Sequence, residues 1–163
     1  MHNLISTYRI QFHQGFNFQD LEHIIPYLQR LGIKCIYASP VFAATPGSTH
    51  GYDGIDPTVI NPEIGTEEQL LEISQRLRAE NLYWLQDIVP NHMAFDHRNP
   101  WLMDVLEKGQ ASSYAGFFDI SWNGSERLMV PFLGASLADE MQAGNLKLSL
   151  KEGALFFTYF DAA

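Results

Sequence analysis

The chain has 163 residues, of which 46% are hydrophobic and 13% aromatic, which is enough for one domain with a buried core and excludes a disordered or fibrous protein. Ten basic residues stand against 19 acidic ones, and the net charge of −9 disfavours nucleic acid and anionic membrane surfaces as partners. No apolar run approaches the roughly 20 residues needed to cross a bilayer.

Cys35 is the only cysteine, so an internal disulfide is excluded and a reducing compartment is natural. The first residues lack a basic stretch followed by a long apolar one, so no secretory signal is visible. We therefore expect a cytoplasmic protein in which Cys35 is a buried, unreactive strand residue.

The first predicted element is a strand over residues 7–12, where apolar and polar side chains alternate. Arg9 and Gln11 lie on its polar side, which faces either a polar barrel interior or solvent. Residues 18–31 then carry apolar side chains at helical spacing and predict an amphipathic helix. Pro26 lies inside this helix and is expected to kink it or to restart it.

Residues 33–38 form a second short apolar run and predict a buried strand. A long connection rich in Gly, Pro, Thr and Asp follows over residues 41–65, and connections of this length are usually functional or disordered. A capping box at Thr66 opens a helix that Asn81 ends, and residues 82–89 predict a third buried strand.

The alternation of strands and helices predicts an α/β fold with right-handed βαβ units and a parallel sheet in the first part of the chain, residues 1–95. The alternation of strands and helices does not continue after this point. Residues 96–163 are interpreted as an incomplete subdomain inserted after the third strand. Its expected elements are a helix at 100–108, a strand at 127–132 and a β-hairpin over 146–160.

Asp87, Asn91 and His92 end the third strand and form the first group of candidate site residues. Parallel α/β sheets and barrels bind ligands at the carboxyl ends of their strands, which is where these polar side chains fall. Asp87 can accept hydrogen bonds there, and His92 can donate to a ligand hydroxyl. The structural alternative is an Asp that caps backbone amides beside a packed loop histidine.

His50, Tyr52 and Asp53 in the long connection form the second group. An aromatic ring flanked by polar side chains suits a sugar site, because the ring covers the apolar face of a pyranose while carboxylates and imidazoles bind its hydroxyls. The alternative is a turn in which Gly51 and Gly54 supply positive φ angles and Tyr52 packs locally.

We expect no metal and no cofactor. His13 and His97 have no partner at metal-ligand spacing, and the chain has no Gly-rich phosphate loop. A calcium ion held by Asn91 and Asp carboxylates is a minor alternative.

The segment Asp87-Ile88-Val89-Pro90-Asn91-His92 resembles the first conserved segment of the α-amylase superfamily, glycoside hydrolase family 13, and residues 50–53 resemble the loop after that family's second strand. Within the family, the chain is similar to the transglucosylases that turn the reducing-end α-1,4 bond of a maltooligosaccharide into the α,α-1,1 bond of trehalose. The matching stretches are residues 6–11, 25–28, 37–40, 46–53, 87–94, 99–101, 114–122 and 159–161.

The resemblance implies a (β/α)₈ TIM barrel with a second domain inserted after the third strand. It also implies that Tyr52 stacks on the sugar at the rearranged bond, that Asp87 supports the hydrogen-bond network, and that His92 binds a hydroxyl of that sugar. His50, Asp53 and Asn91 are further candidates for sugar binding.

The family's nucleophile belongs to an Arg-x-Asp motif after the fourth strand, and no such motif occurs here. A barrel of this type needs roughly 250 residues. We therefore expect the N-terminal portion of an enzyme, with about three barrel strands and no nucleophile or acid/base, inactive alone and prone to self-association through exposed barrel edges. The alternatives are an α-amylase-type hydrolase and a non-catalytic glucan-binding remnant.

Overall fold

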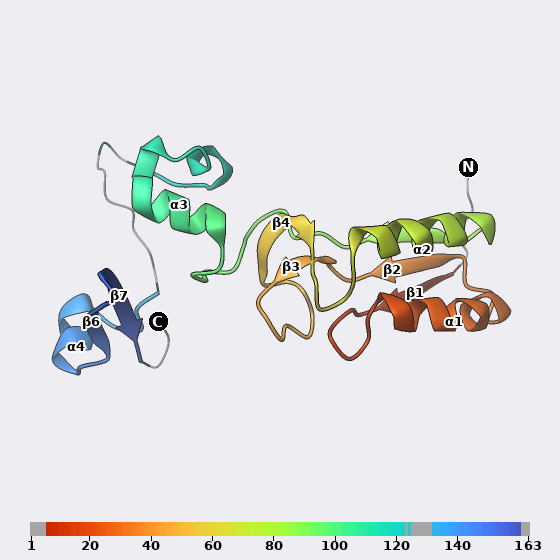
Figure 1. Ribbon diagram of the computed structural model, residues 1–163, viewed down its shortest axis with the longest axis horizontal. Helices are drawn as coiled ribbons and strands as arrows, with labels where there is room; N and C mark the ends of the chain where they lie inside the picture. Colours follow the sequence, from red (N-terminus) through yellow and green to blue (C-terminus); the bar gives the residue numbers. More distant parts are fainter. Residues whose placement is uncertain (1–5, 123, 125–131, 161–163) are drawn as a thin grey trace. The chain divides into compact units, whose positions relative to one another are not determined.

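The computed structural model describes residues 6–122, 124 and 132–160. The chain divides between Met103 and Asp104 into two compact units (Figure 1). Among the described residues, no helix is long and apolar enough to span a membrane.

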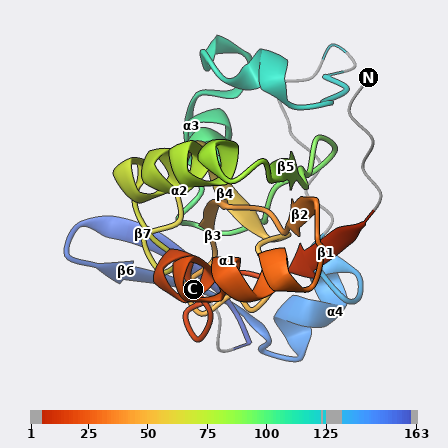
Figure 2. The same cartoon turned by 90° about the vertical axis from the view of Figure 1, so that its right-hand side faces the viewer.

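The first unit is built around a three-stranded parallel sheet in the order β1-β2-β5. Its helices α1 and α2 lie together on one face of this sheet (Figure 2). The predicted strand–helix–strand–helix–strand succession is confirmed, with strands shorter than expected. The elements are β1 (Thr7–Ile10), α1 (Phe18–Arg30), β2 (Cys35–Ala38), β3 (Phe42–Ala44), β4 (Gly54–Ile60), α2 (Glu67–Ala79) and β5 (Tyr83–Gln86).

Each of the two helices begins directly after an N-cap residue, Asn17 for α1 and Thr66 for α2. The side chain of Asn17 accepts from the first amides of α1 and the carboxylate of Asp20 accepts from the Asn17 amide, while Thr66 and Gln69 make the reciprocal pair at α2. These contacts satisfy amides that have no partner within the helix, and they fix each start.

Pro26 lies inside α1, which runs on as one helix, so the expected restart at this residue is wrong. Proline has no N–H, so it leaves the carbonyl of Glu22, four residues earlier, without its helical partner. Arg76 of α2 donates to that carbonyl over 3.0 Å. A side chain from the neighbouring helix thus replaces the missing backbone bond.

The core lies between the sheet and the two helices. Fourteen buried apolar side chains form one cluster there: Ile10, Phe12, Phe18, Leu21, Ile25, Leu28, Ile33, Ile36, Ala38, Val41, Ile64, Ile73, Leu77 and Leu82. Cys35 is 1% exposed, as predicted, and burial raises the pKa of its thiol. The opposite face of the sheet carries the polar side chains of Arg9 and Tyr37.

The long connection is not free of regular structure. Residues 41–65 contain β3 and β4, which form an antiparallel pair with register shifts between Phe42 and Ala43 and between Ala43 and Ala44. This small sheet was not predicted from the sequence. It frames the turn that carries His50, Tyr52 and Asp53.

The helix α3 (Pro100–Lys108) begins in the first unit and ends in the second, with Asn99 accepting from the amides of Trp101 and Leu102 as expected for a cap. The other elements of the second unit are η1 (Gly109–Ala111), η2 (Ala115–Phe117), α4 (Leu137–Gln142), β6 (Leu146–Lys151) and β7 (Ala154–Tyr159). The expected strand at 127–132 falls almost entirely outside the described residues.

The predicted hairpin is confirmed, with β6 and β7 paired antiparallel. Its two-residue turn has positive φ at Glu152 and Gly153, which suits the twist of the flanking strands. Tyr159 joins the hairpin to α4, because its hydroxyl donates to the buried carboxylate of Glu140 over 2.8 Å and accepts from the amide of Gly134.

Candidate functional site

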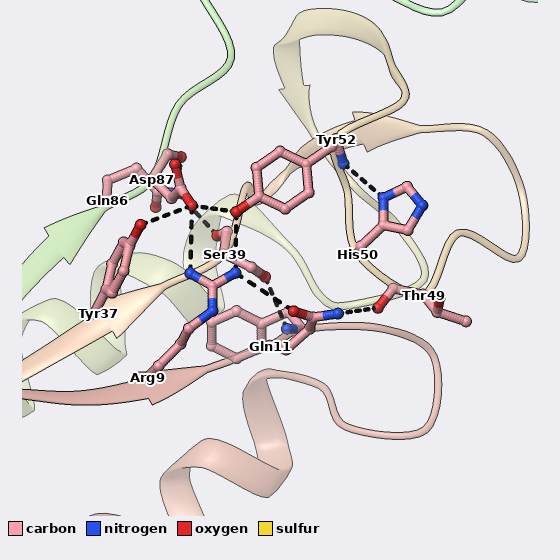
Figure 3. Close-up of polar contacts among 10 residues, drawn as sticks. Arg9, Gln11, Tyr37, Ser39, Thr49, His50, Tyr52, Gln86 and Asp87 are labelled. Atoms are coloured by element: carbon pink, nitrogen blue, oxygen red, sulfur yellow. Dashed lines mark hydrogen bonds and ion pairs between the residues drawn. The ribbon is translucent and has the colours of Figure 1, made fainter.

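A polar cluster lies at the carboxyl ends of the parallel strands. Asp87 directly follows β5, and its amide extends the sheet by donating to the carbonyl of Ala38 over 2.9 Å. One carboxylate oxygen, Oδ2, accepts from Arg9 of β1 over 3.3 Å, from the hydroxyl of Tyr37 of β2 over 3.1 Å, and from the hydroxyl of Tyr52 (Figure 3). Three strands and one turn therefore converge on a single carboxylate.

The guanidinium of Arg9 is central to this cluster. Its Nη1 donates to Asp87 and its Nη2 donates to the hydroxyl of Tyr52 over 3.0 Å. Its carbon Cζ lies 4.7 Å from the centre of the Tyr37 ring, within the range of a cation–π contact. The parallel register explains this contact, since Arg9 and Tyr37 are paired directly across β1 and β2.

These contacts set the protonation of the cluster. Hydrogen bonds from Tyr52, Tyr37 and Arg9 lower the pKa of Asp87, although burial opposes them. The hydrogen bond to Asp87 raises the pKa of Tyr52, and the hydrogen bond to Tyr52 raises the pKa of Arg9. At neutral pH the cluster thus holds a carboxylate, a neutral phenol and a guanidinium cation.

The turn carrying Tyr52 is closed by the carboxylate of Asp53. Burial acts to raise the pKa of Asp53, but hydrogen bonds from the hydroxyls of Ser48 and Thr45 outweigh it and the pKa is lowered. Gly51 has a φ of +76°, and a Cβ there would lie 2.7 Å from the carbonyl oxygen of Pro40. The turn therefore requires glycine at this position.

His50 stands beside Tyr52 in the same turn. Its Nδ1 accepts from the amide of Tyr52 over 3.1 Å, and the two ring centres are 5.9 Å apart. The same nitrogen lies 3.6 Å from Asp53 Oδ1. Two of the predicted residues, His50 and Asp53, thus support the turn that presents Tyr52.

Asn91 and His92 lie in the exposed segment after β5. The Oδ1 of Asn91 and the Nδ1 of His92 are 2.9 Å apart. In the part of the chain that the structure describes, no hydrogen bond joins this pair to Tyr52 or Asp87. Sugar binding by Asn91 and His92 stays a prediction.

Three members of the network were not predicted as site residues: Arg9, Gln11 and Tyr37. A signal existed for two of them, because Arg9 and Gln11 occupy the polar side of the first alternating strand. Their orientation was left open, and the structure places both on the Asp87 side of the sheet (Figure 3). Within the described ranges, no three His, Cys, Asp or Glu side chains lie close enough to hold a metal ion together.

The arrangement combines an aromatic ring with charged and polar groups at one edge of the sheet. Tyr52 offers a half-buried aromatic ring at the rim, and Asp87 offers an ionised acceptor beside it. An aromatic face next to fixed acceptors is the usual composition of a site for a polyhydroxylated ring.

The chain is similar to known carbohydrate-active proteins. The family described as alpha amylase, catalytic domain, matches residues 14–141. A putative maltooligosyl trehalose synthase of Mycobacterium tuberculosis (strain ATCC 25618 / H37Rv) is 38% identical over 93% of the chain and 22% of its own length. A maltogenic alpha-amylase of Bacillus acidopullulyticus is 39% identical over 61% of the chain and 16% of its own length.

The same relationship appears among solved structures. A crystal structure of maltooligosyl trehalose synthase matches with a TM-score of 0.85 and 39% identity, over 97% of this chain and 22% of that one. The chain thus spans about a fifth of the length of the relatives it matches.

Proposed function

The chain belongs to the α-amylase catalytic-domain family, and from this membership we propose that it supplies part of the sugar site of a maltooligosyl trehalose synthase. Its β1-β2-β5 sheet with α1 and α2 is the N-terminal portion of that family's (β/α)₈ barrel. In a protein of the relatives' full length, the reaction would convert the reducing-end α-1,4 bond of a maltooligosaccharide into an α,α-1,1 trehalose linkage.

One observation carries the choice of a synthase over a hydrolase. The likeness to the mycobacterial synthase covers 93% of the chain, whereas the likeness to the maltogenic amylase covers 61% at nearly the same identity. The part of the chain shared with the amylase therefore does not distinguish the two activities. The additional residues shared with the synthase favour transglucosylation.

The roles proposed for individual residues follow the geometry. Tyr52 would lie against the pyranose at the rearranged bond, and the ionised Asp87 beside it would accept a sugar hydroxyl or orient the phenol. His92, Asn91, His50 and Asp53 would complete the polar surroundings. The nucleophile and the general acid/base would come from later barrel strands, because this chain has no Arg-x-Asp motif.

The enzymatic test uses the full-length protein with maltopentaose and follows reducing ends and chain length together. We expect reducing ends to disappear without shortening of the glucan. Release of shorter maltooligosaccharides with new reducing ends would show hydrolysis instead and would overturn the synthase proposal.

Binding is tested on the 163-residue chain itself by calorimetry with maltopentaose. Tyr52→Ala should abolish measurable binding, because it removes the aromatic face of the proposed site. Tyr27→Ala is the matched control, since Tyr27 is a half-exposed tyrosine on α1. Equal affinity of the two variants would contradict the role given to Tyr52.

We also propose that the isolated chain self-associates. Among the described residues, β1 and β5 each pair only with β2, so each offers one unpaired edge. Unpaired edges add further strands readily. Sedimentation equilibrium over a range of concentrations would detect the association, and a concentration-independent monomer would exclude it.

Two further assignments complete the proposal. Residues 96–163 are assigned to a subdomain inserted after the third barrel strand, which limited proteolysis of the full-length protein would release as a separate fragment. A cytoplasmic location is supported by the single buried thiol of Cys35, and cell fractionation tests it.

A further inference from the structure

Arg9 of β1 and Gln11, which directly follows this strand, have no part in the proposed chemistry and connect the Tyr52 turn to the end of β5. We propose that Arg9 and Gln11 are positioning residues that fix the ring of Tyr52 and its turn over Asp87. The sugar-facing role of Tyr52 rests on the proposed function, whereas the linkage rests on contacts within this chain.

The first part of the linkage is the fork of Arg9. Its two terminal nitrogens reach different partners, Asp87 on one side and the Tyr52 hydroxyl on the other, over 3.3 and 3.0 Å (Figure 3). A planar guanidinium presents its donors at fixed angles, and a lysine ammonium does not. Arg9 therefore holds the phenol and the carboxylate at a set separation.

Arg9 also fixes the direction of the Tyr52 proton. A guanidinium can only donate, so the phenol oxygen must accept from Arg9. The single phenol hydrogen is then available for Asp87, which is the partner that the Tyr52 hydroxyl contacts. One arrangement of hydrogen bonds remains, and it points the hydroxyl of Tyr52 into the cluster.

The second part of the linkage is Gln11. Its Oε1 accepts from Arg9 Nη2 over 3.4 Å, and its Nε2 donates to the backbone carbonyl of Thr49 over 2.9 Å. Thr49 precedes Tyr52 by three residues in the same turn. Gln11 thus ties the backbone of the turn to the strand that carries Arg9.

Groups from β2 and from the turn face this linkage. Tyr37 of β2 lies under the guanidinium and donates to Asp87, and His50 of the turn lies beside the Tyr52 ring. Arg9 is 37% exposed and Asp87 16% exposed at their side chains. The linkage therefore sits at the rim of the site, where a ligand would meet it.

The test measures the titration of Tyr52 and the mobility of its turn, and neither measurement needs a sugar. Tyrosine Cζ is labelled with ¹³C, and the Tyr52 signal among the seven tyrosines is assigned with Tyr52→Phe. Hydrogen exchange of the Gly51 and Tyr52 amides is followed at neutral pH. The variants are Arg9→Met, Arg9→Lys and Gln11→Leu, with exposed Arg30→Met of α1 as the matched control.

Arg9→Met should raise the pKa of Tyr52, because the cation and its donated hydrogen bond favour the phenolate. It should also speed exchange of both amides about tenfold, as expected for the loss of one to two hydrogen bonds. Gln11→Leu should speed exchange with little effect on the titration. Arg9→Lys should keep part of the titration effect but lose the protection, and Arg30→Met should change neither.

An unchanged Tyr52 pKa together with unchanged exchange in folded Arg9→Met would overturn the proposal. If Arg9→Met does not fold, Gln11→Leu and Arg9→Lys decide it by the same exchange measurement. Maltopentaose binding by the unsubstituted chain is recorded alongside. Absence of binding with altered titration and exchange would reject the proposed function and leave the positioning roles standing.

Discussion

Arg76 of α2 donates from Nη1 to the backbone carbonyl of Glu22 in α1, four residues before Pro26. The proline cannot supply an N–H to this carbonyl, and the guanidinium does so in its place. A side chain of α2 thus replaces the backbone hydrogen bond that α1 lacks at Pro26, and this contact links the two helices.

Arg76→Met should lower the free energy of unfolding by about 1 kcal/mol, because a partly buried carbonyl loses its partner. In a Pro26→Ala background the loss should be smaller, since the alanine amide can bond to Glu22 within the helix. A double-mutant cycle by urea denaturation measures the difference. Additive effects would show that Arg76 acts only through its other partner, Glu80.

Gly51→Ala should be more damaging than Gly47→Ala, although both glycines have positive φ. A Cβ at Gly47 meets nothing within 4 Å, so its cost is the backbone strain of about 1–2 kcal/mol. A Cβ at Gly51 also collides with the carbonyl of Pro40, which adds about 1–3 kcal/mol. Urea denaturation gives both values, and equal losses would contradict the close approach to Pro40.

Asp96 should titrate far below an ordinary aspartate. Hydrogen bonds from the side chain of Arg98, at 2.8 and 2.6 Å, lower its pKa to about 2, with burial opposing them. Because the folded pKa is the lower one, the ionised pair stabilises the fold above about pH 4, and this contribution is lost as the pH falls towards about 2.

Carboxyl NMR titration checks this value. Arg98→Met should return the pKa of Asp96 towards the ordinary range, whereas Lys108→Met, which removes the partner of Asp104, should leave it unchanged. A pKa of Asp96 that does not respond to Arg98→Met would show that the pairing does not form in solution.

Tyr159→Phe should lower the stability of the second unit against unfolding. The hydroxyl donates to the buried Glu140 carboxylate and accepts from the Gly134 amide, so its removal leaves both with fewer partners. The expected loss is about 2 kcal/mol. Hydrogen exchange of β6 and β7 amides should quicken while the amides of α1 stay protected, and uniform protection in both would contradict the anchoring role.

The βαβαβ part of the fold was predictable because its signals are local. Alternation marks β1, and the caps at Asn17 and Thr66 mark the helix starts. The β3–β4 pair was missed because residues 41–65 are rich in Gly, Pro, Thr and Asp and were interpreted as a connection, and Pro57 is unfavourable in a regular strand. The register shift accommodates it, since Pro57 falls between Asp56 and Ile60, which pair with neighbouring residues of β3.

The site was predictable only in part. Tyr52 and Asp87 were singled out by residue type and position, and the structure brings them into contact. Arg9 lies 78 residues from Asp87 in sequence, and their contact depends on the register of β1 against β2. No local pattern encodes that register, so the orientation of Arg9 could not be derived from its own strand.

Several polar groups of the turn between β3 and β4 are hydrogen-bonded within the chain. Asp53 receives the hydroxyls of Thr45 and Ser48, and the amide of Gly47 donates to the carboxylate of Glu63 over 3.0 Å. If the turn binds a glucan as proposed, little conformational entropy of the protein chain is lost on binding. Association rates should therefore vary little among glucans of different length, and discrimination should appear in their residence times.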